Sequence, residues 1–289
     1  MSELGGIDLQ LVADTVQAAL PGAGELPLED GPSSLLNRWW RIVATGFCFA
    51  CFGIGGLLLG LLVFPLFLFV VRCPERRSVR ARQTIHHLFR LFVGLMCVVG
   101  VCRLEVRGRE RLRRDGQLIL ANHPSLIDVV FLMSLVRNAD CIVKAALLRN
   151  PFTRGPVRAA GFVCNDSGPG LVDDCIAAVR AGRNLIVFPE GTRTPAHADL
   201  GKLQRGAAHL AVRGGLAITP VRISCRPRML GKADKWWRVP LRAGHFVIEV
   251  GDDIPVDSPV HDGMQALAAR RLTDELKRHL GAETSNATA

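Results

Sequence analysis

The feature that most constrains this chain is a long apolar segment near its start. Residues Ile42 to Val71 include no charged side chain, and this run exceeds the roughly 20 residues with which an α-helix crosses a bilayer. Trp39 and Trp40 stand at its entrance with Arg38 and Arg41, an arrangement typical of an interfacial anchor. Its exit is basic, with Arg72, Arg76, Arg77, Arg80 and Arg82. The positive-inside bias therefore predicts that everything after this exit faces the cytoplasm.

The length of the segment leaves two arrangements open, a tilted span or a helical hairpin embedded in one leaflet. The residues at which it is expected to break are Gly53, Gly55, Gly56 and Pro65. A second apolar run, Leu91 to Cys102, is too short to span and predicts an interfacial or re-entrant helix. We therefore predict a membrane-anchoring helical region over residues 35–102. The alternative is a buried helix pair in a soluble protein.

Composition agrees with membrane contact. Hydrophobic residues make up 49% of the chain and the mean hydropathy is +0.24. The net charge is +10, yet the first 37 residues hold six acids and no lysine or arginine, so the remainder carries 10 + 6 = +16. This charge favours anionic partners, either lipid headgroups or nucleic acid. No nucleic-acid motif accompanies it, so we expect lipids and no nucleic acid. Residues 1–34 are predicted to be an acidic extension and linker, without an assigned function.

From Arg103 onward short apolar runs alternate with helical patterns. Strands are predicted near 104–106, 118–121, 141–143, 161–164, 185–188, 217–223 and 246–250, and helices at 125–136, 171–181, 203–212 and 263–280. Such alternation favours an α/β domain, with a central mostly parallel or mixed sheet covered by helices, over residues 103–289.

The stretch Asn122-His123-Pro124-Ser125-Leu126-Ile127-Asp128 lies between a predicted strand and a predicted helix. On a continuous helix, side chains five residues apart point roughly 140° away from each other. His123 and Asp128 can therefore meet only if His123 lies in the loop and Asp128 in the first turns of the helix. Pro124 is expected at the first helical position, where proline is favoured. The pair is a candidate general base and its partner, and the alternative is an ordinary cap or surface histidine.

A second polar stretch, Phe188-Pro189-Glu190-Gly191-Thr192-Arg193, directly follows a predicted strand. It combines an acid, a hydroxyl and a guanidinium in a glycine-containing turn, so polar groups are expected at an edge of the sheet where ligands bind. An ordinary turn with a surface ion pair is the alternative.

Together these stretches resemble the glycerolipid acyltransferase family, whose best-known members are the 1-acyl-sn-glycerol-3-phosphate acyltransferases. The first block of that family, NHxxxxD, is matched by Asn122, His123 and Asp128, and its block FPEGTR is matched at all six positions. Lys144, Gly206-Ala207, and the apolar stretch with Ile218, Pro220 and Val221 also match. The resemblance covers roughly residues 104–223.

The resemblance implies acyl transfer from an acyl thioester, on coenzyme A or acyl carrier protein, to a lipid hydroxyl. His123 would act as general base and Asp128 would orient it. Glu190, Gly191, Thr192, Arg193 and Lys144 would bind the acceptor, with Glu190 orienting Arg193 or the acceptor hydroxyl. A backbone N–H near Gly191, or another loop amide, is the candidate oxyanion donor.

One position departs from the family pattern. Ser167 stands where an arginine that holds the acceptor phosphate is expected, and a hydroxyl supplies neither a fixed charge nor a bidentate fork. Lysophosphatidate is the leading acceptor, and the alternative is a non-phosphate acceptor, such as a lyso-ornithine lipid or an aryl-polyene-type product. An alternative of another class is a catalytically silent membrane subunit that binds lipid or carrier.

No metal or nucleotide motif is present, and no cofactor is expected beyond the thioester co-substrate. The nine scattered cysteines are predicted to be reduced packing residues. The expected partners are membrane lipids and an acyl carrier protein as the other donor option, while the oligomeric state is left open. The expected location is the inner cell membrane with the catalytic domain on its cytoplasmic side, in phospholipid biosynthesis.

Overall fold

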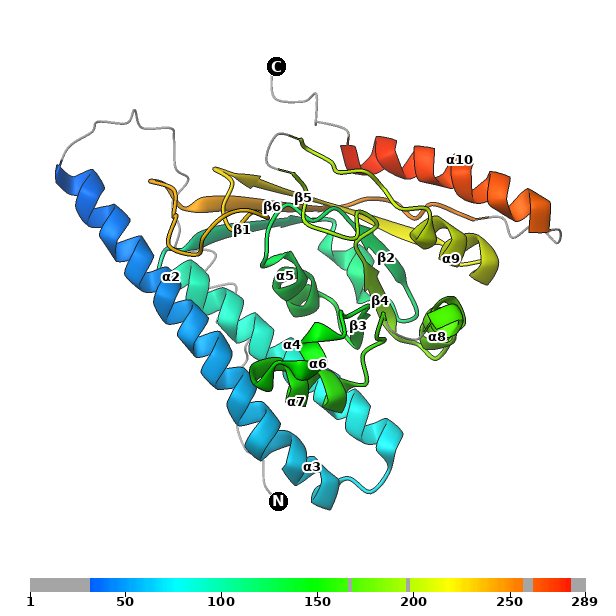
Figure 1. Ribbon diagram of the computed structural model, residues 1–289, viewed down its shortest axis with the longest axis horizontal. Helices are drawn as coiled ribbons and strands as arrows, with labels where there is room; N and C mark the ends of the chain where they lie inside the picture. Colours follow the sequence, from blue (N-terminus) through cyan, green and yellow to red (C-terminus); the bar gives the residue numbers. More distant parts are fainter. Residues whose placement is uncertain (1–31, 166–167, 196–197, 257–261, 282–289) are drawn as a thin grey trace.

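The computed structural model describes residues 32–165, 168–195, 198–256 and 262–281 (Figure 1). A six-stranded sheet lies at its centre in the order β1-β6-β5-β2-β4-β3, with bounds Cys102–Arg107 (β1), Leu118–Ala121 (β2), Ala139–Cys141 (β3), Asn184–Val187 (β4), Ile218–Arg226 (β5) and Gly244–Val250 (β6). All neighbouring strands are parallel except β5 and β6, which are antiparallel. The predicted α/β fold with a mixed sheet is confirmed.

Helices cover both faces of the sheet (Figure 1). The described residues form the α-helices α2 (Pro32–Leu58), α3 (Phe64–Val70), α4 (Pro74–Val98), α5 (Asp128–Leu135), α6 (Ala146–Arg149), α7 (Pro151–Ala160), α8 (Leu171–Arg180), α9 (Gly206–Gly214) and α10 (Asp262–Gly281). Alternate side chains of β2 enter two separate cores, as the two-residue period of a strand requires. Ile119 and Ala121 pack with α4 and α5, while Leu118 and Leu120 pack with α8, α9 and α10.

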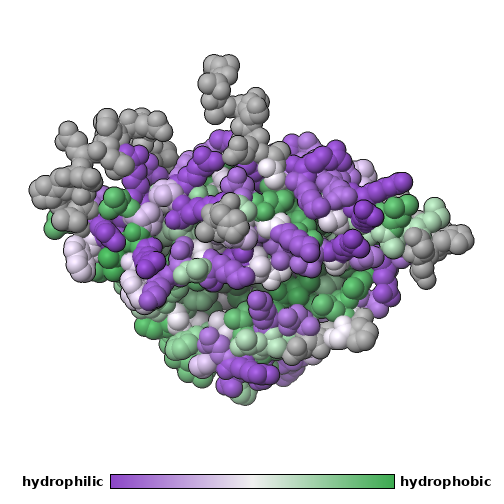
Figure 2. Space-filling view, turned by 45° about the horizontal axis from the view of Figure 1, so that its top comes forward, coloured by the Kyte–Doolittle hydropathy of each residue, from purple (hydrophilic) through white to green (hydrophobic). Residues whose placement is uncertain are grey.

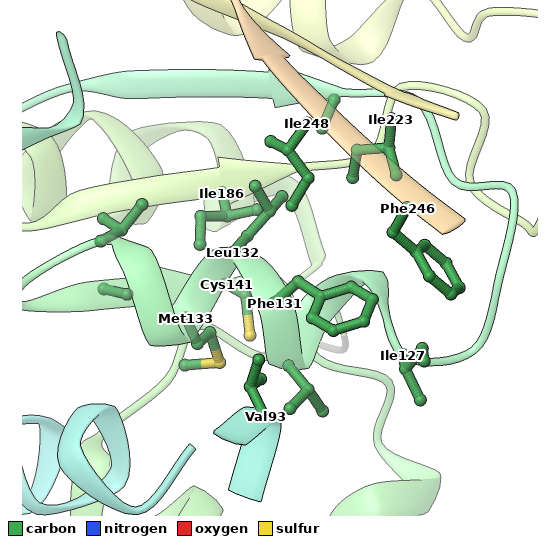
Figure 3. Packing of buried hydrophobic residues seen from close by; sticks show 14 of the residues in the cluster. Val93, Ile127, Phe131, Leu132, Met133, Cys141, Ile186, Ile223, Phe246 and Ile248 are labelled. Carbon is green, nitrogen blue, oxygen red and sulfur yellow. The ribbon is translucent and has the colours of Figure 1, made fainter. Parts of the chain in front are cut away.

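The core beneath α5 is dense and apolar. Figure 3 shows Phe131 and Leu132 of α5 beside Ile248 and Phe246 of β6. The rings of Phe131 and Phe246 lie 4.8 Å apart at 59°, a tilted geometry that aromatic pairs prefer. This packing fixes α5 against the sheet, and with it the position of Asp128 at the start of that helix.

The apolar segment forms the first arm of a long helical hairpin. α2 continues through a π-helical turn at Leu59–Val63 into α3, and α4 runs back along it (Figure 1). The predicted breaks at Gly53, Gly55, Gly56 and Pro65 are wrong, because the chain stays helical through all four. Pro65 lies in the first turn of α3, directly after the π-helical turn Leu59–Val63.

The second arm is longer than predicted. α4 begins at Pro74 and includes the arginine-rich run, whereas the prediction placed a short helix only at Leu91 to Cys102. Apolar runs alone miss such a helix because its first half is amphipathic and charged. Phe52 of α2 packs against Phe89 and Phe92 of α4, with ring centroids 6.1 and 5.6 Å apart.

Two glycines let the hairpin approach the α/β domain. A Cβ built on Gly155 of α7 would collide with the backbone of Gly60, so these helices meet backbone to backbone. A Cβ on Gly56 would likewise collide with the carbonyl of Phe152. Helices α6 and α7 were not predicted, because Gly155 and Pro156 inside α7 are poor helix formers. At this contact close packing overrides helix propensity.

A buried arginine joins α4 to the loops at the end of the sheet. Arg82 is 4% exposed, and it donates to Asn138 Oδ1 at 2.7 Å and to the Ala160 carbonyl at 2.6 Å. Burial, together with the neighbouring Arg183, lowers its pKa. Arg183 itself pairs with the fully buried Asp140 at 3.1 Å. The hairpin is thus tied to the domain by polar bonds as well as by packing.

One predicted strand is absent from this part of the chain. Gly161 adopts a left-handed conformation that ends α7, and of the predicted strand 161–164 only an isolated bridge between Cys164 and Val143 forms. Strand β3 likewise ends at Cys141, two residues before the predicted end. Short apolar runs predict burial here but not ladder pairing.

The outer surface of the hairpin is apolar. Large hydrophobic side chains on it are exposed, including Leu36, Trp39, Trp40, Val43, Phe47, Ile54, Leu58, Leu61, Leu62, Leu66 and Phe69. Residues 36–70 form one helix that is long and apolar enough to cross a membrane. In Figure 2 hydrophilic side chains cover most of the upper part of the visible face, while hydrophobic ones show along its lower left edge.

Candidate active site

The site begins where β2 ends, beside the longer strand β5. The Asn122 side chain continues the pairing of these strands: its amide donates to the Ile223 carbonyl at 2.8 Å, and its Oδ1 accepts from the Ile223 N–H at 2.6 Å. Asn122 is buried, so these bonds are shielded from water. The asparagine thereby fixes the direction in which the chain leaves the sheet at His123.

His123 and Asp128 meet as their spacing predicted. His123 lies in the loop, Asp128 is the first residue of α5, and the imidazole Nδ1 lies 2.8 Å from Asp128 Oδ2. With Nδ1–H donating to the carboxylate, Nε2 keeps its lone pair. The prediction that Pro124 starts the helix is wrong, because α5 begins only at Asp128. The intervening residues turn instead, with the Ser125 N–H donating to Asp128 Oδ2 at 2.7 Å.

Asp128 is enclosed completely, with no exposed surface. Burial raises the pKa of its carboxyl group, and the bonds from His123 and from the Ser125 N–H oppose that rise. Its Oδ1 has no hydrogen-bond partner among the described residues. A buried carboxylate with one unsatisfied oxygen costs free energy, so its position is maintained by the surrounding fold.

The second motif supports the first. The ring of Phe188, just after β4, stacks on the His123 imidazole with centroids 4.3 Å apart and an angle of 27°. Glu190 Oε1 accepts from the His123 backbone N–H at 2.9 Å. The Thr194 N–H donates to the His123 carbonyl at 2.7 Å. Three contacts from one loop thus hold both the ring and the backbone of His123.

Glu190 serves as an internal clamp. Its side chain is buried, and besides His123 it accepts from the Thr194 hydroxyl at 2.8 Å and from the Gly201 N–H at 2.8 Å. These bonds do not include Arg193, which donates to other groups, so Glu190 does not orient Arg193; that it orients the acceptor hydroxyl stays a prediction. A Cβ at position 201 would collide with the Glu190 carboxylate, which would have to shift from its present bonds.

The rest of this loop forms a turn at Gly191 and a hydrogen-bonded link from Arg193 to another loop. Gly191 has a φ of +66°, and its N–H donates to the Phe188 carbonyl at 3.0 Å, so this amide is used by the turn. Thr192 is exposed. Arg193 Nη1 donates to the carbonyls of Leu230 and Gly231 at 3.0 and 2.7 Å. Arg193 therefore joins its loop to the β5–β6 connection, and headgroup binding by Thr192 and Arg193 stays a prediction.

Lys144 reaches the same edge of the sheet from a third strand. β2, β4 and β3 are adjacent and parallel, so the residues that follow them lie at one edge. Lys144 is exposed and follows Val143, whose carbonyl accepts from the Asn165 N–H at 3.0 Å. The other predicted anion-binding position, Ser167, lies outside the described residues.

Sequence reasoning assigned no role to three residues that shape the site. Asn122 and Phe188 were noted only as parts of the motifs, and Thr194 was missed. Each acts through a partner far along the chain: Asn122 through Ile223, and Phe188 and Thr194 through His123. A spacing rule within one segment carries no signal for such bonds.

Comparison with known proteins agrees with this arrangement. Residues 103–224 match the family model described as Acyltransferase. A 1-acyl-sn-glycerol-3-phosphate acyltransferase from Pseudomonas aeruginosa is 31% identical over 151 residues, which cover 49% of this chain and 57% of that protein. The Lyso-ornithine lipid O-acyltransferase of the same organism is 30% identical over 159 residues, which cover 54% of this chain and 59% of that protein.

The acyltransferase fold is also found in a solved structure. The 1-acyl-sn-glycerophosphate (LPA) acyltransferase PlsC from Thermotoga maritima superposes with a TM-score of 0.62 at 20% identity, covering 84% of this chain and 98% of that one. At this identity the likeness concerns the fold. The chain spans about three fifths of the length of the curated relatives that it matches.

Proposed function

We propose that this protein is a membrane-associated O-acyltransferase that moves an acyl chain from an acyl thioester to the hydroxyl of a lysophosphatidate-like lipid. The observation that carries the proposal is the His123–Asp128 pair at the sheet edge, held by the Phe188 stack. The family match of residues 103–224 and the relative that acts on 1-acyl-sn-glycerol-3-phosphate support the reaction class.

In this reaction, Nε2 of neutral His123 takes the proton of the acceptor hydroxyl as its oxygen attacks the thioester carbonyl carbon. Asp128 holds the required tautomer and stabilises the imidazolium that forms. The tetrahedral intermediate then collapses, the C–S bond breaks, and the imidazolium returns its proton to the leaving thiolate. The side chain of His123 is 16% exposed, which leaves an edge of the ring open to a substrate. General-base catalysis of this kind contributes about 10²–10⁴ in rate.

The hairpin supports a membrane location for this chemistry. Its exposed apolar surface and the basic residues of α4 suit the boundary between acyl chains and anionic headgroups. Gly46 and Gly53 of α2 and Gly60 of the π-helical turn pack on the α/β domain. These contacts would have to be broken if this helical arm left the domain to span the bilayer. They favour a hairpin lying in one leaflet, which we place at the cytoplasmic side of the inner membrane.

The general base is tested by His123→Ala in the full chain. The alternative donors are labelled acyl-CoA and acyl carrier protein loaded with a labelled acyl chain. We expect transfer to fall by about 10²–10⁴ while membrane association persists. His209, exposed on α9, provides the matched control, and His209→Ala should retain full activity. Turnover of the His123→Ala protein at the wild-type rate would disprove the assignment.

A second acceptor class is favoured by two specific observations. Ser167 replaces an expected arginine, and the Lyso-ornithine lipid O-acyltransferase is 30% identical to this chain, beside 31% for the 1-acyl-sn-glycerol-3-phosphate acyltransferase. Labelled thioester offered separately with lysophosphatidate and with lyso-ornithine lipid distinguishes them. Labelled phosphatidate is the expected product, and its absence beside a labelled ornithine lipid would reverse our choice of acceptor.

A further inference from the structure

The connection between β5 and β6 carries a surface that the catalytic residues do not use. Residues 232–238 are all exposed, and they include two neighbouring tryptophans, Trp236 and Trp237, which are 43% and 47% exposed. Leu241 adds a third exposed apolar side chain. Tryptophans exposed side by side are unusual on a soluble surface, whereas they are enriched at the interface between water and bilayer.

This surface is also basic. Between residues 231 and 242 four cations (Lys232, Lys235, Arg238 and Arg242) stand against one acid, Asp234. Asp234 is used internally, since it accepts from the Gly231 N–H at 2.7 Å. The Lys235 ammonium lies 5.2 Å from the centre of the Trp237 ring, so charge and aromatic surface occupy the same place. The chemistry that matches both is a layer of anionic headgroups above apolar chains.

The surface continues directly into the apolar face of α2. The Trp236 ring lies 6.2 Å from the Phe49 ring, and it would be 3.2 Å from a Cβ at Gly46. Val43 and Phe47, on either side of Gly46 in the sequence, are 61% and 51% exposed. A bilayer that covers α2 would therefore reach the Trp236–Trp237 pair without a gap.

The same connection is bonded to both catalytic motifs. The Leu230 carbonyl accepts from the Leu126 N–H, between His123 and Asp128, and from Arg193 Nη1, each at 3.0 Å. The Gly231 carbonyl accepts a further bond from Arg193 at 2.7 Å. A force or displacement at residues 232–241 is therefore transmitted within a few residues to the loops around His123.

We infer that residues 232–242 are a second membrane-contact element, which seats Trp236 and Trp237 in the interfacial layer of an anionic bilayer and so holds His123 at headgroup depth. The inference rests on the proposed membrane association of the hairpin. It goes beyond that association, because it assigns bilayer contact to the α/β domain itself.

The first test measures depth by tryptophan fluorescence. In full-length protein carrying Trp39→Phe and Trp40→Phe, only Trp236 and Trp237 emit. The protein is reconstituted in phosphatidylglycerol-containing or phosphatidylcholine vesicles with lipids brominated near the headgroup. We expect a blue shift and bromolipid quenching, both stronger in the anionic vesicles, and protection from iodide.

Other outcomes overturn the inference. Iodide-accessible tryptophans without bromolipid quenching, in protein that floats with the vesicles, would place the pair in water. Iodide protection without bromolipid quenching would instead indicate that the tryptophans contact protein. The contact would be with a second copy of this chain if the protection is seen with the enzyme alone, and with an acyl carrier protein if it is seen only after that carrier is added. Because His123→Ala should leave the fluorescence unchanged, failure here is distinguishable from failure of the proposed reaction.

The second test concerns turnover at the surface. Lys235→Ala/Arg238→Ala should weaken binding to anionic vesicles, by about fivefold for each cation removed, and raise the apparent KM for a vesicle-embedded acceptor. Its kcat for a short-chain, monomeric acceptor should not change. Arg270→Ala/Arg271→Ala on α10 is the matched control, since those exposed arginines lie beyond the opposite face of the sheet. An equal loss with the monomeric acceptor would show that the two cations act on the catalytic site instead.

Discussion

The helical hairpin and the site at the sheet edge differ in which side chains they bury and which they expose. The hairpin exposes apolar side chains, such as Phe69 at 82%, which no other part of the described chain buries. The site buries polar groups, Asn122, Asp128 and Glu190, and meets nearly all of their hydrogen-bonding needs internally. The geometry of the site therefore depends on individual hydrogen bonds. The exposed face of the hairpin makes few specific contacts with the protein and suits an apolar environment instead. Single substitutions should be severe in the first region and mild in the second.

The largest expected effect is at the buried carboxylate. In Asp128→Asn the NH2 group either takes the buried place of Oδ1, which has no partner among the described residues, or displaces the acceptor shared by His123 Nδ1 and the Ser125 N–H. The neutral amide also stabilises the imidazolium less than a carboxylate does, so activity should fall by about 10²- to 10⁴-fold. Steady-state transfer measured at saturating thioester checks this. A loss below tenfold would show that Asp128 does not orient the base.

The same variant tests the pKa of Asp128. Because burial raises that pKa in the folded state, ionisation of Asp128 destabilises the fold. Its contribution is most favourable below the unfolded-state pKa of about 3.9 and is lost as the pH rises through the folded pKa. The free energy of unfolding of Asp128→Asn relative to wild type should therefore increase from pH 4 towards neutrality. Denaturant titrations across this range give the slope.

Glu190→Ala ranks next, because it leaves buried donors at His123, Thr194 and Gly201 without an acceptor. We expect a loss of about 3 kcal/mol in stability, together with most of the activity, since the His123 backbone is released. Glu190→Gln keeps one acceptor oxygen, so its stability and activity should lie between those of Glu190→Ala and wild type. If Glu190→Ala reduced activity without changing stability, Glu190 would contact substrate instead of supporting the loop.

The contact between the two regions should show an intermediate effect. Gly155→Ala would push α7 away from Gly60 and cost about 1–3 kcal/mol of stability by overpacking. Gly94→Ala in α4 is the matched control, since nothing lies within 4 Å of its added methyl, and it should stabilise by roughly 0.5–1 kcal/mol. Thermal unfolding in one detergent compares them. Equal midpoints for the two variants would mean that α7 does not depend on close approach to α2.

The smallest effect on stability is expected on the exposed face of the hairpin. Leu61→Gln/Leu62→Gln changes side chains that are 62% and 63% exposed, so unfolding in detergent should shift by less than about 1 kcal/mol. Flotation with vesicles should nevertheless decrease. Ile119→Gln, at a fully buried position of β2, should by contrast prevent folding. A large loss for the double variant in detergent would place its leucines in a protein core.

Much of the fold was predictable because its signals are local. The strand 118–121 and the helix starting at Leu171 were placed at their observed limits, since an apolar run bounded by turn residues depends on neighbouring positions only. The helix 151–160 was missed because Gly155 and Pro156 argue against it locally. Gly155 is explained by its close contact with Gly60, which lies nearly a hundred positions earlier in the chain.

The sequence by itself determined the chemistry that the chain brings to its site. The spacing of His123 and Asp128, the FPEGTR block and the uncharged segment before Arg72 are legible without coordinates, because each is written in one continuous stretch. The tertiary structure alone decided how these parts are used. In the folded chain Glu190 accepts from the His123 backbone, Arg193 links its loop to Gly231, and Trp236 lies beside α2. Hydrogen bonds and ring contacts between distant segments depend on the path of the whole chain, and that path is set by how the two cores pack on the sheet.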